Sequence, residues 1–111
     1  MDAEISLVYV TTPDRDVAHA IARTVVEEGL AACANIIPGM ESLYRWQGKV
    51  ESAQECVLIL KCRSSGFDAL SSRVCTLHPY EVPCILALPV TAGLPRYLAW
   101  LSAESAGRPT V

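Results

Sequence analysis

Residues 30–63 read LAACANIIPGMESLYRWQGKVESAQECVLILKCR, and this stretch predicts one very long β-hairpin. Gln47-Gly48 separates two apolar arms, and a glycine there supplies the positive φ that a tight hairpin loop needs. Two arms of roughly sixteen residues at about 3.3 Å each would reach on the order of 50 Å. A compact domain of this length has a radius of gyration of only about 13 Å. The hairpin must overhang its domain or bend, and we expect the bend at Pro38-Gly39, because proline cannot donate to a ladder and glycine favours a bulge.

The overhanging part of this hairpin carries large apolar side chains at Leu43, Tyr44 and Trp46. A chain of 111 residues has little else with which to cover them. Large apolar patches on a soluble protein mark contact surfaces, and another copy of the chain is the simplest partner. The hairpin therefore predicts a homo-oligomer with these three side chains at the contact.

Two further strands and three helices are predicted around the hairpin. Thr12 is the expected N-cap of the first helix and Gly29 its C-terminal cap, and Ser64-Ser65 offers an N-cap for the second, which stops before Pro79. The expected elements are a strand at 4–12, a helix from Pro13 to Glu28, the two hairpin arms, a helix bearing Phe67, Leu70, Val74 and Leu77, a strand at 84–90, and a helix from Pro95 through Leu101.

The order strand, helix, strand, strand, helix, strand is that of the split βαβ, or ferredoxin-like, sandwich of the α+β class. We expect residues 1–111 to form a single such domain, with a long central hairpin, an extra C-terminal helix and a frayed tail at 103–111. Right-handed crossovers place both main helices on one face of the sheet. The other face stays bare, which is a second reason to expect a cyclic homo-oligomer.

Composition and charge narrow the class of partner. The net charge is −3, and Lys and Arg form no cluster, which argues against nucleic acid or an anionic membrane. No apolar run reaches eighteen residues, so no transmembrane helix is expected. The first residues, MDAEISLV, are acidic rather than basic and do not resemble a secretory signal, so we predict a cytoplasmic protein.

The strongest candidate for chemistry is the loop LHPYEVP at 77–83, which places His78, Tyr80 and Glu81 between a helix and a strand. One interpretation makes His78 a metal ligand. The other gives His78 a role at the helix end and lets Tyr80 pack with its hydroxyl in water. Metal binding needs two or three converging donors, and this string supplies only His78 and Glu81. We therefore predict no tightly bound cofactor, and the residues leave open a weaker or subunit-bridging metal site that uses His78 with a cysteine or carboxylate from elsewhere in the chain.

Outside the 77–83 loop, the sequence contains no catalytic motif, but several of its residues are candidates to line a pocket. No GxSxG elbow or phosphate-binding glycine loop is present, and His19 is predicted on a helix surface, so we predict no catalytic residue and no enzyme. Five cysteines, an odd number without CxxC spacing, are expected to be reduced and mostly buried. Lys61 lies within an apolar strand and needs a partner or a route to water. The candidate cleft-lining residues are Cys33, Trp46, Lys61, Tyr80, Glu81 and Cys84.

Three strings in this order, LAACANIIPGMESLYRWQGKVE, ECVLILK and LHPYEVPCILALPV, closely resemble the CutA family of divalent-cation tolerance proteins. The resemblance extends from about Leu7 to Leu101. It implies a ferredoxin-like subunit, a homotrimer in which long hairpins wrap neighbouring subunits, a cytoplasmic location and a role in copper tolerance. It does not imply an established enzymatic activity.

The resemblance also implies copper ligands at a cysteine ending the first strand and at a His-His pair before Pro-Tyr. In this chain those positions are Thr11 and Leu77-His78, so only His78 is retained. Thr11 is a poor copper ligand, and the Leu77 side chain has no donor atom. The alternative is a trimeric scaffold or signalling protein that binds a small ligand or a partner protein in clefts between subunits.

Overall fold

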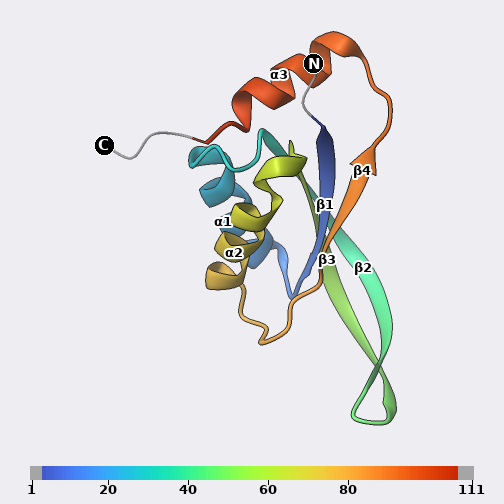
Figure 1. Ribbon diagram of the computed structural model, residues 1–111. Coiled ribbons are helices and arrows are strands. Elements are labelled where there is room, and N and C mark those ends of the chain that lie inside the picture. The colour runs from blue at the N-terminus through green and yellow to red at the C-terminus, as the bar shows by residue number, and fades with distance from the viewer. Residues whose placement is uncertain (1–3, 108–111) are drawn as a thin grey trace.

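The computed structural model describes residues 4–107 of the chain as a four-stranded antiparallel sheet with three α-helices. Its elements are β1 (Ile5–Thr12), α1 (Arg15–Glu27), β2 (Cys33–Trp46), β3 (Lys49–Arg63), a 3₁₀ turn (Ser64–Gly66), α2 (Phe67–Leu77), β4 (Ile85–Val90) and α3 (Pro95–Glu104). The strand order is β2-β3-β1-β4, and α1 and α2 lie together on one face of the sheet (Figure 1). The predicted α+β class and ferredoxin-like architecture are confirmed.

The main core lies between the sheet and the helices α1 and α2. Alternate residues of each strand point to opposite faces of a sheet, and every second residue of β1 and of β3 from Cys56 onward is buried against the helices. Ile21 and Val25 of α1 are buried in this core, and so are Leu70 and Val74 of α2. The strand residues of this core include Val8, Val10, Cys56, Leu58, Leu60 and Cys62.

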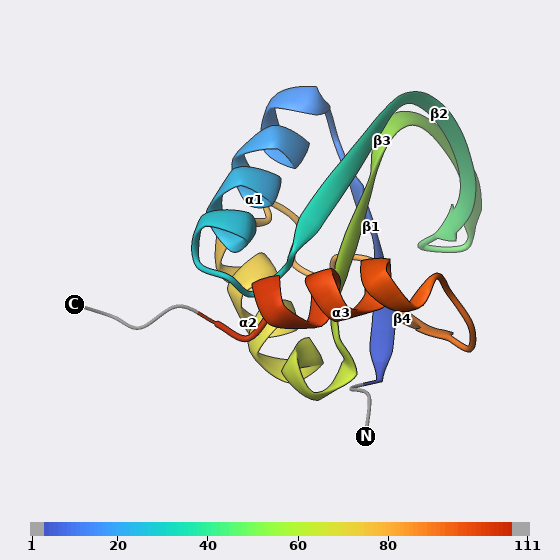
Figure 2. The same ribbon diagram turned by 90° about the horizontal axis from the view of Figure 1, so that it is seen from above.

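The hairpin runs past the helical layer and bends (Figure 2). Its pairing is regular from Cys33 opposite Lys61 to Ile37 opposite Val57, then shifts before Met40, so the bulge lies at the predicted Pro38-Gly39. Both residues of the closing turn have positive φ, 51° at Gln47 and 79° at Gly48, as a two-residue hairpin turn requires. The chain measures 47 × 34 × 22 Å, with a radius of gyration of 14.7 Å.

Two predicted helix caps are wrong. The N-cap of α1 is Asp14, whose carboxylate accepts a hydrogen bond from the Val17 N–H, while the Thr12 hydroxyl donates to the Cys56 carbonyl of β3. Thr12 is fully buried at the end of a strand, and that position takes its hydroxyl away from the helix. The N-cap of α2 is Gly66, because the predicted capping serines form a 3₁₀ turn ahead of the helix.

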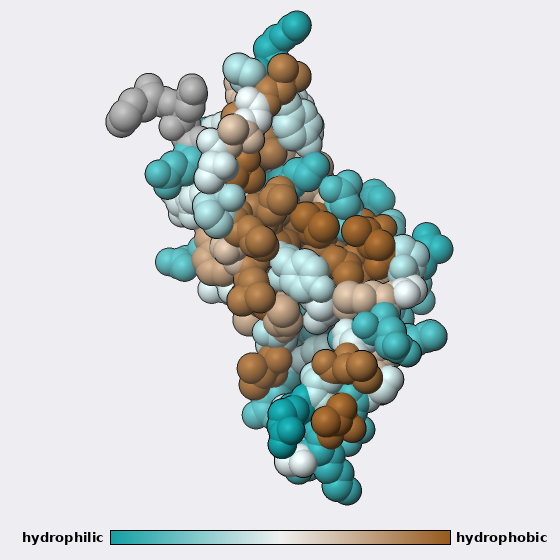
Figure 3. Space-filling view, turned by 90° about the vertical axis from the view of Figure 1, so that its right-hand side faces the viewer, coloured by the Kyte–Doolittle hydropathy of each residue, from teal (hydrophilic) through white to brown (hydrophobic). Residues whose placement is uncertain are grey.

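The sheet face opposite α1 and α2 is only partly bare, which corrects the prediction of a fully bare face. One end is covered by α3, where Leu101 packs with Ile5 and Ala32. The rest of the face exposes Leu86 and Leu88 of β4 and Ile37 of β2. Figure 3 shows hydrophobic side chains gathered across this surface, with further ones along the hairpin. We call this surface the open face.

The last described residues continue directly from α3. The predicted frayed tail begins at residue 103, inside α3, and Ser105 is buried, donating to the Leu101 carbonyl and accepting from the Arg63 N–H. The Gly107 N–H donates to the Gly29 carbonyl after α1. Residues 108–111 of that prediction lie outside the described residues, and the single domain over residues 1–111 stays a prediction.

Candidate functional site

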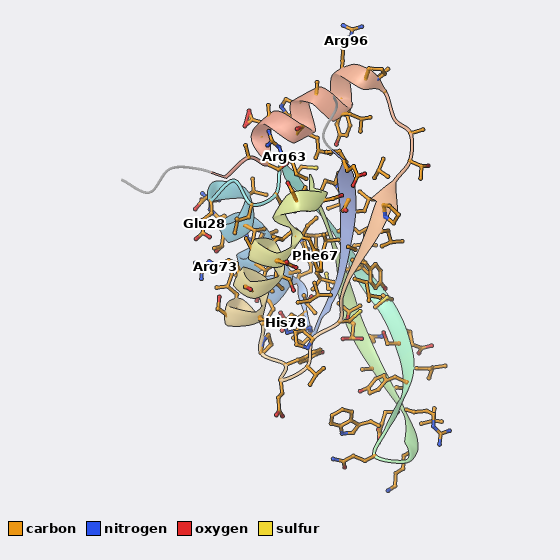
Figure 4. The ribbon with its side chains drawn as sticks, in the orientation of Figure 1. Glu28, Arg63, Phe67, Arg73, His78 and Arg96 are labelled. Carbon is orange, nitrogen blue, oxygen red and sulfur yellow. The ribbon has the colours of Figure 1, made fainter. Side chains whose placement is uncertain are left out.

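The first candidate site is built around His78, the residue that follows α2. Pro79 prevents the helix from continuing, and His78 adopts extended backbone angles, as expected of a residue before proline. This geometry turns the imidazole under the end of α2 toward β1, where it is only 7% exposed (Figure 4). Its Nε2 lies 2.8 Å from the Thr11 carbonyl oxygen, and the Tyr80 N–H donates to Nδ1 at 3.1 Å.

These two hydrogen bonds determine the protonation of the ring. Nδ1 accepts from a backbone N–H, so it carries no proton, and Nε2 carries the hydrogen donated to the Thr11 carbonyl. The imidazole is therefore neutral, and both nitrogens are engaged by the backbone. A metal ion could bind this ring only after one of the two hydrogen bonds breaks, so any such binding must be weak.

Tyr80 connects His78 to a carboxylate on the hairpin. Its ring lies 4.7 Å from the His78 ring, and its hydroxyl donates to Glu55 Oε2 at 3.0 Å. Partial burial, followed by the Glu55 hydrogen bond and charge, raises the pKa of Tyr80 to about 12. At neutral pH Tyr80 is therefore a protonated phenol that orients Glu55, rather than an anionic ligand.

The second candidate site lies near the C-terminal end of β3, under α3. Lys61 Nζ donates to Tyr97 Oη at 3.1 Å, and Cys33 Sγ lies 3.7 Å from the same oxygen. The Tyr97 hydrogen bond is the largest cause that raises the pKa of Lys61, so the ammonium is charged at neutral pH. The partner that the sequence requires for Lys61 is thus a tyrosine from α3.

The predicted cleft residues fall into three separate places. Cys33 and Lys61 are cross-strand partners under α3, whereas Tyr80 lies near His78. Trp46 lies at the hairpin tip opposite Lys49, twelve positions along the strand from Lys61, which is roughly 40 Å at strand spacing. Glu81 is exposed and Cys84 is half-buried in the loop before β4. One chain alone does not unite these residues in a single cleft.

Sequence reasoning missed two residues that complete these sites. Glu55 is not among the candidate residues predicted from the sequence, yet the Tyr80 hydroxyl donates to its carboxylate across a separation of 25 residues. Tyr97 lies 36 residues from Lys61 and 64 from Cys33, and no local pattern signals such contacts. Within residues 4–107, no three His, Cys, Asp or Glu side chains are grouped so that they could hold a metal ion.

Comparison with known proteins places the chain in a family. Residues 6–104 match the model of the CutA1 divalent ion tolerance protein family. The chain belongs to this CutA1 family. The CutA1 match extends over all three helices and over the whole sheet except Ile5, the first residue of β1, so it includes both candidate sites.

Individual CutA relatives support the assignment. The divalent-cation tolerance protein CutA of Thermus thermophilus is 50% identical over 95 residues, which cover 86% of this chain and 92% of the relative. A solved structure of the Thermus thermophilus protein superposes with a TM-score of 0.90 at 47% identity, covering 92% of this chain and 99% of that chain. The chloroplastic protein CutA of Arabidopsis thaliana is 48% identical over 86% of this chain and 52% of its own length.

A third CutA protein comes from Archaeoglobus fulgidus. Its structure is described as a periplasmic divalent cation tolerance protein, and it has a TM-score of 0.88 and 38% identity over 91% of this chain and 98% of that chain. CutA proteins are thus ascribed to more than one compartment. Among residues 4–107 of this chain, no helix is both long and apolar enough to cross a membrane.

Proposed function

We propose that this CutA-family chain contributes to divalent-cation tolerance as a cytoplasmic homotrimer that binds copper or another divalent cation weakly beside His78. The observation that carries the proposal is the match of residues 6–104 to a divalent ion tolerance family. The proposal includes no catalysed reaction, because in neither candidate site does a general base contact the proton of a nucleophile. Its chemistry is metal binding alone.

The His78 loop supports weak rather than tight metal binding. The imidazole is one donor, and the Glu55 carboxylate reaches the same loop through Tyr80. Freeing Nδ1 breaks only a hydrogen bond within the loop, whereas freeing Nε2 would break the hydrogen bond that joins the ring to β1. A cation that takes Nδ1 must displace the Tyr80 N–H, and this competition lowers its affinity.

The homotrimer is supported by the apolar side chains that the chain leaves uncovered. Leu43 is 70% exposed and Trp46 is 58% exposed on the hairpin beyond the bulge. Leu86 and Leu88 extend the apolar surface across the open face. Both β2 and β4 are edge strands, whose free hydrogen-bonding groups allow neighbouring subunits to pair in a closed ring.

Titration with Cu²⁺ and with Zn²⁺ tests the metal-binding part of the proposal. We expect His78→Gln to weaken binding by at least about tenfold, because it removes the only imidazole of the loop. His19→Gln is the matched control, since His19 is exposed on α1 and should bind metal as the unsubstituted protein does. Circular dichroism checks that both variants fold. Identical binding curves for the two variants would remove His78 from the proposal.

The separation of the predicted cleft residues favours a second candidate function. Cys33 with Lys61, Trp46, and Tyr80 can line one cleft only if different subunits contribute them. A trimeric scaffold or signalling protein would bind a small organic ligand or a partner protein there. A thermal-shift screen separates the two functions, because a ligand stabilises the folded state that binds it. Stabilisation by organic compounds and not by metals would favour the second function.

A further inference from the structure

Cys33, Lys61 and Tyr97 form a polar cluster at the end of the sheet that α3 covers, and metal tolerance does not explain it. We call these three residues the thiol cluster. Lys61 and Cys33 lie opposite each other in β3 and β2, and Tyr97 reaches them from the first turn of α3. Trp100 packs on the Tyr97 ring at a centroid distance of 5.6 Å and holds the phenol over the strands. The cluster is thus assembled from three elements and has a defined geometry.

The hydrogen bonds of the thiol cluster run in one direction. Lys61 has only hydrogens to donate, so Tyr97 Oη accepts at 3.1 Å, and the phenol hydrogen is free to point at Cys33 Sγ, 3.7 Å away. A thiolate formed at Cys33 therefore meets a hydrogen-bond donor backed by a positive charge. Reactive cysteines occur in this kind of environment, beside cationic groups and partly open to solvent.

Lys61 has no acidic partner within the described chain. The ion pairs found in residues 4–107 join Arg23 to Glu27 and Arg73 to Glu28. The Lys61 ammonium instead lies 5.4 Å from the centre of the Tyr97 ring. Its charge is thus not neutralised by a carboxylate, and it can attract an anionic reagent to the neighbouring sulfur.

Three of the other four cysteines, Cys56, Cys62 and Cys75, differ from Cys33 in ways that make them internal references. Cys56 and Cys62 are buried in the core, and burial raises the pKa of Cys62 to about 11, so neither sulfur is open to reagents. Cys75 is exposed on α2, yet within residues 4–107 no hydrogen bond reaches its sulfur. Cys33 is half-buried. Exposure alone therefore predicts faster reaction at Cys75, and the thiol cluster predicts the opposite.

We propose that Cys33 is a reactive thiol site for anionic low-molecular-weight disulfides, with Lys61 attracting the anion and Tyr97 hydrogen-bonding the sulfur. The Cys33 thiolate attacks one sulfur of the disulfide, and the reagent's S–S bond breaks as a mixed disulfide forms on Cys33. The other half leaves as a thiolate with the electron pair and takes up the proton that the Cys33 thiol released. Cys33 is oxidised and the departing half is reduced, so the exchange needs no other oxidant.

The rate of labelling of the full-length protein tests this proposal. The probes are dithiobis(nitrobenzoate), which is anionic, and dithiodipyridine, which is neutral, and peptide mass spectrometry assigns the labelled cysteine. We expect the anionic probe to label Cys33 about tenfold faster than Cys75. Cys33→Ser should abolish the fast phase, and Cys75→Ser should leave it unchanged. Labelling of Cys33 at or below the rate of Cys75, or none at all, would overturn the proposal.

Variants of Tyr97 and Lys61 test whether these two side chains raise the reactivity of Cys33. Tyr97→Phe should slow Cys33 labelling with both probes, because the donor to sulfur is lost. Lys61→Met should slow the anionic probe several-fold more than the neutral one, and Lys61→Arg should restore the difference. Tyr9→Phe is the matched control, since it removes a hydroxyl that donates to Met40 Sδ at 3.5 Å without touching the thiol cluster. Equal slowing of both probes by Lys61→Met would contradict the role of its charge.

Discussion

The two ends of the long hairpin differ in what covers them. Near Leu58 and Leu60 the strand β3 is central in the sheet, and its side chains are completely buried under α1 and α2. Beyond the bulge the same two strands continue without a helical layer, and Leu43 and Trp46 are largely exposed. A single chain therefore supplies the cover for one end of the hairpin and not for the other. The uncovered end has the composition of a subunit contact, with large apolar and aromatic side chains.

A charge at the hairpin tip should have the largest effect, because it should weaken the proposed subunit contact. Trp46→Glu places a carboxylate where the proposed contact needs an apolar ring, and we expect the dissociation constant of the assembly to rise by about thirtyfold or more. Sedimentation velocity measures this change. Gln54→Glu is the control, because it adds the same carboxylate at an exposed polar position of the same hairpin. An assembly that survives Trp46→Glu as well as it survives Gln54→Glu would show that the tip is not the contact.

Truncation in the core should have the next largest effect. Leu58 is fully buried in β3, and Leu58→Ala should lower the free energy of unfolding by about 2–5 kcal/mol, since it leaves a cavity. Leu43→Ala should cost less, and its cost should depend on protein concentration because in the proposed assembly Leu43 is covered by another subunit. Urea unfolding at two protein concentrations measures both. A larger loss for Leu43→Ala than for Leu58→Ala at low concentration would reverse the comparison.

The turn that closes the hairpin should be sensitive to a single methyl group. Gly48 has a φ of +79°, and Ala there has open space around its Cβ, so the cost is conformational and about 1–2 kcal/mol. Gly66→Ala is the matched control, because Gly66 also has open space but a φ of −96°. Thermal unfolding should show destabilisation by Gly48→Ala only. Equal melting temperatures for the two variants would mean that the turn is not held in this conformation.

The smallest effect concerns the ion pair between α1 and α2. Arg73 Nε and Nη2 donate to the Glu28 carboxylate at 2.9–3.2 Å, and these hydrogen bonds, followed by the Arg73 charge, lower the pKa of Glu28 below 4.5 (Figure 4). A carboxyl group with a lowered pKa in the folded state stabilises the protein above its unfolded pKa and loses that contribution as the pH falls through its folded pKa.

Glu28→Gln should therefore lower the melting temperature slightly at neutral pH, and the difference from the unsubstituted protein should disappear at pH values below the folded pKa of Glu28. Glu27→Gln, in the exposed pair with Arg23, should have a still smaller effect. Calorimetry from pH 7 downward measures both variants. A difference for Glu28→Gln that grows as the pH falls would have the wrong sign for this pair.

Local patterns in the sequence predict much of the fold because they depend on neighbouring residues. The turn at Gln47-Gly48, the bulge at Pro38-Gly39 and the left-handed Gly29 follow from backbone rules that act within a few residues. The helix caps at Thr12 and Ser64-Ser65 were wrong because tertiary contacts compete for the hydroxyls: Thr12 bonds to β3, and Ser64 bonds to Ser6.

The candidate sites could be predicted only in part, since their contacts join distant segments. His78 is brought to the end of β1, where its hydrogen bond spans 67 residues, and its two backbone partners are invisible in the loop sequence. Lys61 was correctly expected to need a partner, but that partner, Tyr97, lies on a helix whose position depends on packing against Ile5 and Ala32. A sequence pattern identifies residues that need partners more readily than it identifies the partners.

The molar mass in solution tests most directly whether further copies of the chain cover the exposed part of the hairpin and the open face. One chain has a mass of 12.0 kDa, and sedimentation equilibrium of the unsubstituted protein at low micromolar concentration should give three times that mass. A folded species of 12.0 kDa across the whole concentration range would contradict the account.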